Sequence, residues 1–397
     1  VVAVVRLSGM IGSGPRAQLS DEAIAPVLER AFRRGKPQAV ALLINSPGGS
    51  ATASDILYRE ISAYKRRSGV KIVAAMMGLA TSGGYYVALP ADTIEGLQNW
   101  YTFTDFDHFI NIYRAISDCL RTPDDIELIT REFLAGQAAQ NIVYSEVTFT
   151  PYTHYQNRGI AFADQLAAIN RARRWADHEL GTRMGLVIDI SRNVTPAEGI
   201  ITAEWAIKHH GDDVIALGLG GPEVGHPPEK FTEAFALAQD AGVPAVPHAG
   251  ETEGPTSIKG ALDALHAVRI GHGVRCLEDA ALVAELRDRQ IPLEVCPTSN
   301  VCLKVTPDFA SHPLPQLMAE GLYVTLNSDD PPMFNTTLTD EYLMAADAFR
   351  WDAAVCEGLV LNAARASLLP DAEKATLESR LTADFARLRA DHGITED

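Results

Sequence analysis

Histidines and carboxylates stand just after three short apolar runs in the C-terminal half of the chain. His248 and Glu251 follow the first run, and His272 follows the second. Asp329 and Asp330 follow the third. Imidazole and carboxylate ligands suit zinc, which in a catalytic site keeps an open position for water. A further carboxyl group or histidine beside the metal can move protons and orient that water. These residue types therefore predict a metal-assisted hydrolytic site, provided that the three runs end at one place.

The apolar runs alternate with amphipathic helical patterns such as 162–180 and 278–289, which indicates βαβ units and a parallel sheet. Seven strands are predicted, over Ile142–Phe149, Met184–Ser191, Val214–Leu219, Val243–Val246, Val268–Gly271, Ile291–Cys296 and Tyr323–Asn327. This rhythm predicts a TIM-type (β/α)8 barrel that lacks its own first strand. The carboxyl ends of barrel strands meet at one mouth, so the histidines and carboxylates would surround one pocket.

The first 86 residues follow a different pattern. They contain three predicted strands, over Val1–Arg6, Gln38–Asn45 and Val70–Met77. The segment holds eleven Lys/Arg and five Asp/Glu, whereas the whole chain has a net charge of −17. Such a break in charge suggests two origins. We therefore predict two domains, 1–86 and 87–397.

Composition argues against several partners and locations. The net charge of −17 argues against a nucleic-acid backbone or an anionic membrane as partner. The five scattered cysteines form no Cys-x-x-Cys pair, which predicts free thiols in a reducing, cytoplasmic compartment. Residues 72–91 carry no charge but contain Gly83, Gly84 and Pro90, so we interpret them as buried core rather than a membrane span. No signal-peptide pattern is seen at the start of the sequence.

Two motifs in the N-terminal segment point to another chemistry. Residues 44–50 (Ile-Asn-Ser-Pro-Gly-Gly-Ser) and 80–86 (Ala-Thr-Ser-Gly-Gly-Tyr-Tyr) resemble the serine–lysine signal peptide peptidases, which have a ClpP/crotonase-like fold. The resemblance implies one nucleophile and two oxyanion donors, which are Ser82, Gly48 and Gly49. The family's base is a lysine several tens of residues after the serine, but here the next lysine is Lys208. We therefore interpret the segment as a vestigial peptidase βαβ unit.

Four segments of the C-terminal part resemble, in order, the strand-end signatures of the adenosine deaminase family. They are residues 248–251 (His-Ala-Gly-Glu), 269–273 (Arg-Ile-Gly-His-Gly), 296–300 (Cys-Pro-Thr-Ser-Asn) and 328–331 (Ser-Asp-Asp-Pro). These proteins are metal-dependent 6-aminopurine deaminases built on a (β/α)8 barrel. The resemblance covers about 87–397, so it implies a small-molecule purine as the partner of this chain.

The resemblance implies a chemical role for each strand-end group. His248 and Asp329 would bind one divalent metal ion, expected to be zinc. Glu251 would donate a proton to the purine ring, and His272 would lie beside the metal water. Ammonia would leave after hydroxide attack at the purine C6.

The same resemblance implies three contacts to the substrate base. Asp330 would accept a hydrogen bond from the purine ring, and Gly220 or Gly221 would contact the edge of the base. The stretch 220–231 differs from the usual adenosine deaminase sequence Asp-Leu-Ala-Gly-Asp-Glu. The substrate is therefore left open among adenosine, adenine and a modified nucleoside such as aminodeoxyfutalosine.

One family feature is absent from the sequence. The first strand of family members ends in His-x-His and supplies two further metal ligands, whereas the first histidine here is His108. A site without these ligands should hold zinc weakly, since even outer-shell losses typically cost about 10–100-fold in affinity. Our hypothesis is a deaminase that is impaired or inactive. The alternatives are a serine peptidase of the signal peptide peptidase type and a non-catalytic fusion.

Overall fold

A computed structural model describes residues 2–12, 19–33, 37–46, 50–80, 102–211 and 213–394. The chain divides into two compact units. The first comprises residues 1–103 and 111–116, and the second comprises 104–110 and 117–397. Each unit has its own parallel sheet and its own apolar core.

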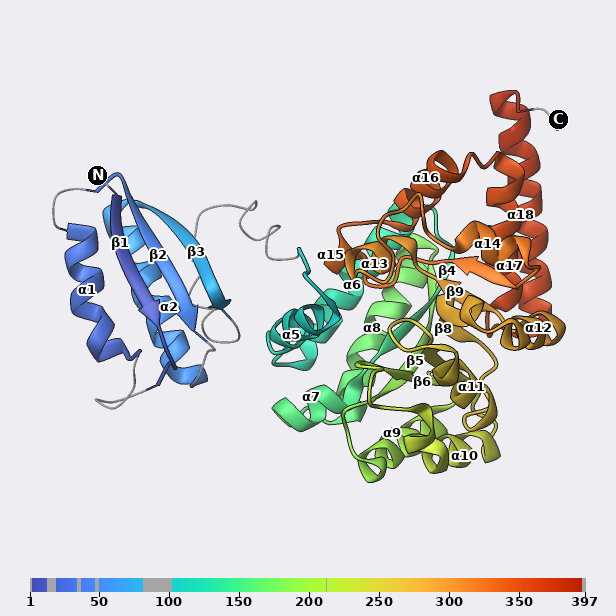
Figure 1. The fold of residues 1–397 in the computed structure, drawn as a ribbon, viewed down its shortest axis with the longest axis horizontal. Helices are drawn as coiled ribbons and strands as arrows, with labels where there is room; N and C mark the ends of the chain where they lie inside the picture. The colour runs from blue at the N-terminus through green and yellow to red at the C-terminus, as the bar shows by residue number, and fades with distance from the viewer. Residues whose placement is uncertain are drawn as a thin grey trace. The chain divides into compact units, whose positions relative to one another are not determined.

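The first unit contains a parallel sheet in the order β1-β2-β3, made of β1 (Val2–Ser8), β2 (Ala39–Ser46) and β3 (Lys71–Ala80) (Figure 1). Its helices are α1 (Asp21–Arg33) and α2 (Ala51–Ser68). Alternate strand residues such as Val5 and Leu42 are buried with Leu28 and Leu57 of the helices. The three predicted strands are therefore confirmed. The predicted nucleophile and oxyanion donors (Ser82, Gly48 and Gly49) lie outside the described residues.

The second unit is built on a parallel sheet of seven strands in the order β10-β9-β8-β7-β6-β5-β4. The strands are β4 (Tyr144–Phe149), β5 (Arg183–Ser191), β6 (Ala216–Gly220), β7 (Ala245–Ala249), β8 (Ile270–His272), β9 (Leu293–Val295) and β10 (Val324–Leu326). Each pairs with its neighbour in sequence, as βαβ units require. The seven predicted strands are confirmed, with shifted ends.

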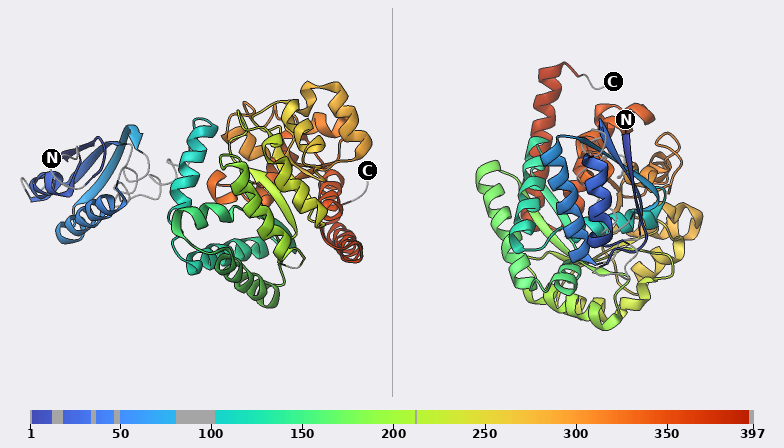
Figure 2. Two further views of the ribbon diagram at one scale, coloured as in Figure 1. Left: turned by 90° about the horizontal axis from the view of Figure 1, so that it is seen from below. Right: turned by 90° about the vertical axis from the view of Figure 1, so that its left-hand side faces the viewer.

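Helices lie between the strands in the sequence and cover the sheet, apart from α5, whose residues 111–116 belong to the first unit (Figure 1, Figure 2). They are α5 (Phe106–Ser117), α6 (Pro123–Ala139), α7 (Pro151–Arg158), α8 (Phe162–Leu180), α9 (Pro196–His209), η1 (Pro228–Phe231), α10 (Thr232–Asp240), α11 (Pro255–Asp263), η2 (Val274–Glu278), α12 (Ala280–Arg289), α13 (Pro297–Cys302), α14 (Leu314–Ala319), α15 (Pro331–Phe334), α16 (Leu338–Phe349), α17 (Ala353–Ala366) and α18 (Asp371–His392). Capping boxes from Thr122 and Thr195 fix the starts of α6 and α9.

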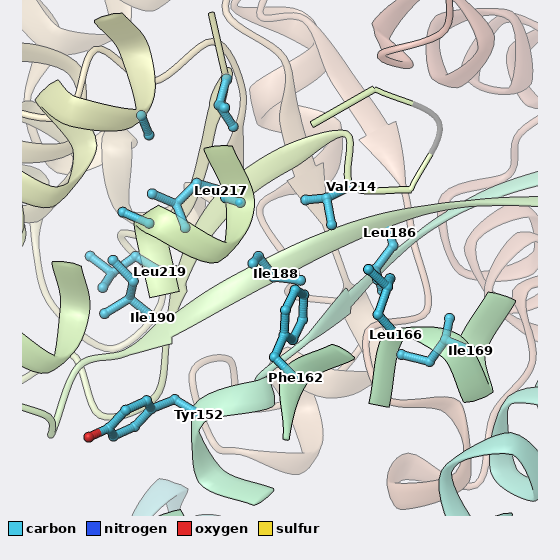
Figure 3. Packing of buried hydrophobic residues seen from close by; sticks show 14 of the residues in the cluster. Tyr152, Phe162, Leu166, Ile169, Leu186, Ile188, Ile190, Val214, Leu217 and Leu219 are labelled. Atoms are coloured by element: carbon cyan, nitrogen blue, oxygen red, sulfur yellow. The ribbon is translucent and has the colours of Figure 1, made fainter. Parts of the chain in front are cut away.

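Strand β5 is buried on both faces of the sheet, which is typical of parallel sheets. All residues of β5 from Met184 to Ile190 are buried. Figure 3 shows Ile188 beside Phe162 of α8, in the same apolar cluster as Leu217 and Leu219 of β6. Each such buried side chain contributes roughly 1.5–3 kcal/mol relative to leaving it exposed. The helices therefore hold the strand ends in place.

An ion-pair network shows that the sheet is curled. Arg269, which precedes β8, is 4% exposed. Its guanidinium pairs with Glu146 of β4 at 2.6 Å and with Glu294 of β9 at 2.7 Å. Because β4 is far from β8 in the sheet order, only a curled sheet brings these side chains together. Among the described residues no strand joins β10 to β4, so the curl matches a barrel without its first strand.

The described part of the chain shows neither a membrane-spanning helix nor a disulfide. No helix in the described ranges is long and apolar enough to cross a membrane. Residues 72–80 belong to β3, and the remainder of the uncharged stretch lies outside the described residues. The five cysteines are free thiols, as predicted.

Candidate active site

The structure brings the predicted strand-end side chains together. His248 lies near the end of β7, His272 is the last residue of β8, and Asp329 follows β10. One possible ligand atom from each residue lies within 4.8 Å of the others. Convergence of three strand ends is therefore a property of the fold, as the barrel prediction required.

Two of these residues have unusual backbone conformations. His272 has φ of 63° and Asp329 has φ of 55°, both in the left-handed region. A non-glycine residue in this region typically costs roughly 1–2 kcal/mol, and such residues cluster at functional sites. The hydrogen bond from Gly273 N to Ala249 O, 3.0 Å long, ties the end of β8 to β7. The fold therefore accepts backbone strain at these two residues, and this backbone conformation directs both side chains into the site.

The hydrogen bonds behind His248 and Asp329 leave ligand atoms available. His248 Nδ1 lies 3.2 Å from the carbonyl oxygen of Leu219, which can only accept, so the proton is on Nδ1 and Nε2 keeps its lone pair. Ser299 Oγ donates to Asp329 Oδ2 at 2.6 Å. Outer-shell bonds of this kind orient metal ligands. The donor set therefore fits a divalent metal ion of the zinc type.

Glu251 is buried beside this cluster, with 7% of its surface exposed. Its Oε2 lies 3.7 Å from His272 Nε2, and Oε1 accepts no hydrogen bond from any described residue. Burial, and then the negative charge of Asp329, raises the pKa of the Glu251 carboxyl. Glu251 therefore keeps its proton to higher pH than an ordinary glutamate, as a proton donor would.

Glu223 holds the loop that carries Glu251, and sequence reasoning did not single it out. Its carboxylate accepts from the backbone N–H groups of residues 250–253, at 2.5, 3.1, 2.8 and 2.8 Å, and from Ser257 Oγ at 2.5 Å. Burial alone would raise the pKa of Glu223, but these donors, with the charge of Arg192, lower it below its usual value. The only sequence signal was a glutamate in the loop after a predicted strand.

Arg192 and Asp189 are two further buried charged residues near His248 that the sequence analysis did not identify. The Arg192 side chain is fully buried and donates to His248 O at 2.6 Å, so it fixes the backbone of that ligand. Asp189 is 3% exposed, and its Oδ1 has no hydrogen-bond partner in the described structure. Burial raises the pKa of Asp189 to about 7, although the charges of His248 and Arg192 oppose the shift.

The predicted substrate contacts lie at the same edge of the sheet. Gly220 ends β6, and a Cβ built there would lie 3.9 Å from His248 Nδ1 and would clash with Asp189 Oδ2, so no side chain fits. Gly221 has φ of 91°, which also favours glycine. Burial, and then Asp329, raises the pKa of the Asp330 carboxyl. The structure therefore places the half-buried backbone of Gly220 near His248, and Asp330 directly after the predicted ligand Asp329.

A curled parallel sheet with histidines and carboxylates at its strand ends is the architecture of a metal-dependent hydrolase barrel. The adenosine deaminase family model matches residues 74–384, so the chain belongs to this family. It is therefore an amidohydrolase of a family that acts on purine-type substrates.

Two curated relatives are named for different purine deaminations. The chain is 40% identical over 301 residues to the aminodeoxyfutalosine deaminase of Streptomyces avermitilis, covering 74% of this chain and 82% of that protein. It is 36% identical over 308 residues to the adenine deaminase of Rhodospirillum rubrum, covering 78% and 91%.

Solved structures share the fold. The adenine deaminase of Arthrobacter aurescens matches with a TM-score of 0.71 and 31% identity, covering 82% of this chain and 93% of that one. An amidohydrolase from Burkholderia ambifaria with bound zinc matches with a TM-score of 0.66 and 28% identity, covering 70% and 77%.

Proposed function

We propose that this protein hydrolytically deaminates a 6-aminopurine and releases ammonia, with one divalent metal ion held by His248 and Asp329. The observation that carries the proposal is the convergence of His248, His272 and Asp329 within 4.8 Å, beside the buried carboxyl of Glu251. Relatives named adenine deaminase and aminodeoxyfutalosine deaminase support the reaction class.

Each residue has a task in this proposal. A bound zinc ion would supply Lewis acidity that lowers the pKa of a water molecule. Glu251, with its raised pKa, gives its proton to the purine ring. His272 holds the attacking water in position. Asp330 accepts a hydrogen bond from the ring, and the backbone of Gly220 or Gly221 contacts the edge of the base.

We propose that the metal is held weakly and that turnover is slow. The His-x-His pair of the family is absent, since no histidine precedes His108. Within the described residues, the cluster of possible ligands contains only His248, His272 and Asp329. Adenine and aminodeoxyfutalosine are the substrates to test first, because curated relatives bear those names and residues 220–231 depart from the adenosine deaminase sequence.

We also propose a division of labour along the chain. Residues 1–86 form a peptidase-like unit that takes no part in deamination, and 87–397 form the deaminase barrel in the cytoplasm. The unit has a parallel βαβ sheet. The sequence contains no lysine between Ser82 and Lys208, so the base that the peptidase family uses is missing. A serine-reactive fluorophosphonate probe should leave Ser82 unlabelled, and stoichiometric labelling would favour the peptidase alternative.

The deciding experiment combines elemental analysis of the purified chain with an ammonia-release assay on adenine, aminodeoxyfutalosine and adenosine. We expect less than one zinc per chain after dialysis, and slow ammonia release when zinc is supplied. A matched His248→Ala variant should lose both, whereas His266→Ala should lose neither. Absence of zinc binding and of ammonia under these conditions would refute the proposal and favour a non-catalytic fusion.

A further inference from the structure

We propose that Asn300 and His312 are positioning residues that fix the tautomer of His272, so that its Nε2–H group donates into the site and the residue is not a metal ligand. This inference deepens the proposed function, because it decides which members of the ligand cluster can bind the metal. It depends on hydrogen-bond directions that can be followed outward from one backbone amide.

The backbone amide of Leu314 determines the direction of the first hydrogen bond in this series. Its backbone N–H lies 3.1 Å from His312 Nδ1, and a backbone amide can only donate. His312 Nδ1 is therefore unprotonated, and the ring proton is on Nε2. The ring is 3% exposed, and burial lowers the pKa of His312 to about 4, so the ring is neutral near physiological pH.

The Asn300 side chain links His312 to His272 through two hydrogen bonds. His312 Nε2 lies 3.1 Å from Asn300 Oδ1, and an N–H group needs an acceptor there. The amide NH2 group must then face His272, and Asn300 Nδ2 lies 3.3 Å from His272 Nδ1. With the amide flipped, the NH2 group of Asn300 would face the Nε2–H group of His312, and two donors would meet. Asn300 has no exposed surface, and its backbone carbonyl oxygen accepts a hydrogen bond from Val305 N at 2.8 Å, so the residue is held in place.

The result is an N–H group aimed at the carboxylates. Because His272 Nδ1 accepts from Asn300, the proton of its neutral ring is on Nε2. That atom lies 3.7 Å from Glu251 Oε2 and 3.7 Å from Asp329 Oδ2. A nitrogen that carries a proton cannot ligate a metal, but it can donate to a water molecule or to either carboxylate.

His248 shows the opposite arrangement. Its Nδ1–H donates to the Leu219 carbonyl, which leaves the Nε2 lone pair for a metal. The two imidazole ring centres are 5.4 Å apart. Neighbouring histidines therefore carry opposite tautomers, one as ligand and one as donor. The metal site is reduced to His248 and Asp329.

The test is nitrogen NMR of the metal-free full-length chain with 15N-labelled histidine imidazoles, in mildly alkaline buffer. Signals of His272 are assigned as those lost in His272→Gln. We expect His272 with an unprotonated Nδ1 and a protonated Nε2, and His248 with the reverse. A protonated Nδ1 on His272 would overturn the proposal, and this reading of the wild-type chain does not depend on any substitution of Asn300.

The substitution Asn300→Asp gives a second, independent test. A carboxylate at this position can accept from both histidines, so His272 Nδ1 should become protonated and the Nε2 lone pair should be released. Zinc affinity should then rise by about 10–100-fold, the range known for outer-shell changes. Asn362→Asp, whose side chain donates to Val324 O away from the site, should change neither reading.

A purely structural role for Asn300 predicts lower stability in Asn300→Asp with the His272 tautomer unchanged, and that result would refute the inference. Neither reading depends on turnover. The expected tautomers without ammonia release would keep this inference and remove the proposed function, whereas ammonia release with the wrong tautomer would do the opposite.

Discussion

Replacing Glu223 by glutamine removes the acceptor that holds the loop carrying Glu251. The carboxylate receives four backbone N–H groups and two hydroxyl groups, and it is 5% exposed. A glutamine amide must turn its NH2 group toward some of these donors. The smaller loss places NH2 at the Oε1 side, where the Ser257 hydroxyl can rotate to accept but the Gly250 N–H loses its partner.

The magnitude follows from these contacts. A buried donor without an acceptor costs about 1–3 kcal/mol, and the remaining bonds lose the strengthening that an ionised acceptor gives. We expect Glu223→Gln to lower the free energy of opening this loop by about 2–4 kcal/mol. Each 1.4 kcal/mol is a factor of ten, so amide exchange should accelerate by roughly 30–1,000-fold.

Hydrogen–deuterium exchange of a peptide that contains residues 250–253 measures this opening directly. The matched control is Glu278→Gln, which removes a half-exposed ion pair to Arg275 and should change local stability by less than about 1 kcal/mol. Wild-type exchange rates in Glu223→Gln would refute the reasoning, because the loop would then be held by other contacts. Ammonia release should fall in the same variant, since Glu251 would lose its fixed position.

Three further predictions concern buried ionisable side chains. His312 has a pKa near 4 when folded, below its usual 6.5, so the unfolded chain binds more protons between these values. The free energy of unfolding should therefore fall by about 3 kcal/mol from pH 6.5 to pH 4, and urea denaturation of His312→Gln should lack this part of the fall. The pKa of Asp189 is raised from 3.8 to about 7, so its ionisation opposes folding increasingly as pH rises between these values. Without metal, Asp189→Asn should gain about 4 kcal/mol relative to wild type across that range, and a pH-independent difference would contradict the assigned shift. Arg269→Met leaves the carboxylates of Glu146 and Glu294 without their partner and should destabilise the barrel by about 3–5 kcal/mol, measured by thermal denaturation.

The sequence was sufficient to predict the alternation of strands and helices, because apolar runs and helical periodicity are local signals. Strand ends were less accurate. Val268–Gly271 was predicted as a strand, but β8 is Ile270–His272, since ladder pairing with β7 and β9 decides where a strand begins. His272 therefore belongs to the strand rather than to a loop.

Some residues of the site could be predicted from local sequence signals, and others could not. His248 and Asp329 could be predicted because each follows an apolar run within a recognisable motif. Glu223 and His312 could not, because their importance comes from contacts with residues 250–253 and with Asn300 that only the folded chain creates. Neither residue lies in a motif of its own.

The left-handed backbone at His272 and Asp329 has a consequence for how this chain can change over generations. Glycine would occupy either position without the steric cost that a side chain meets there. Either glycine would relieve the backbone strain but would also remove a side chain that the site needs. Selection for an unstrained backbone and selection for the chemistry therefore act against each other at these two positions.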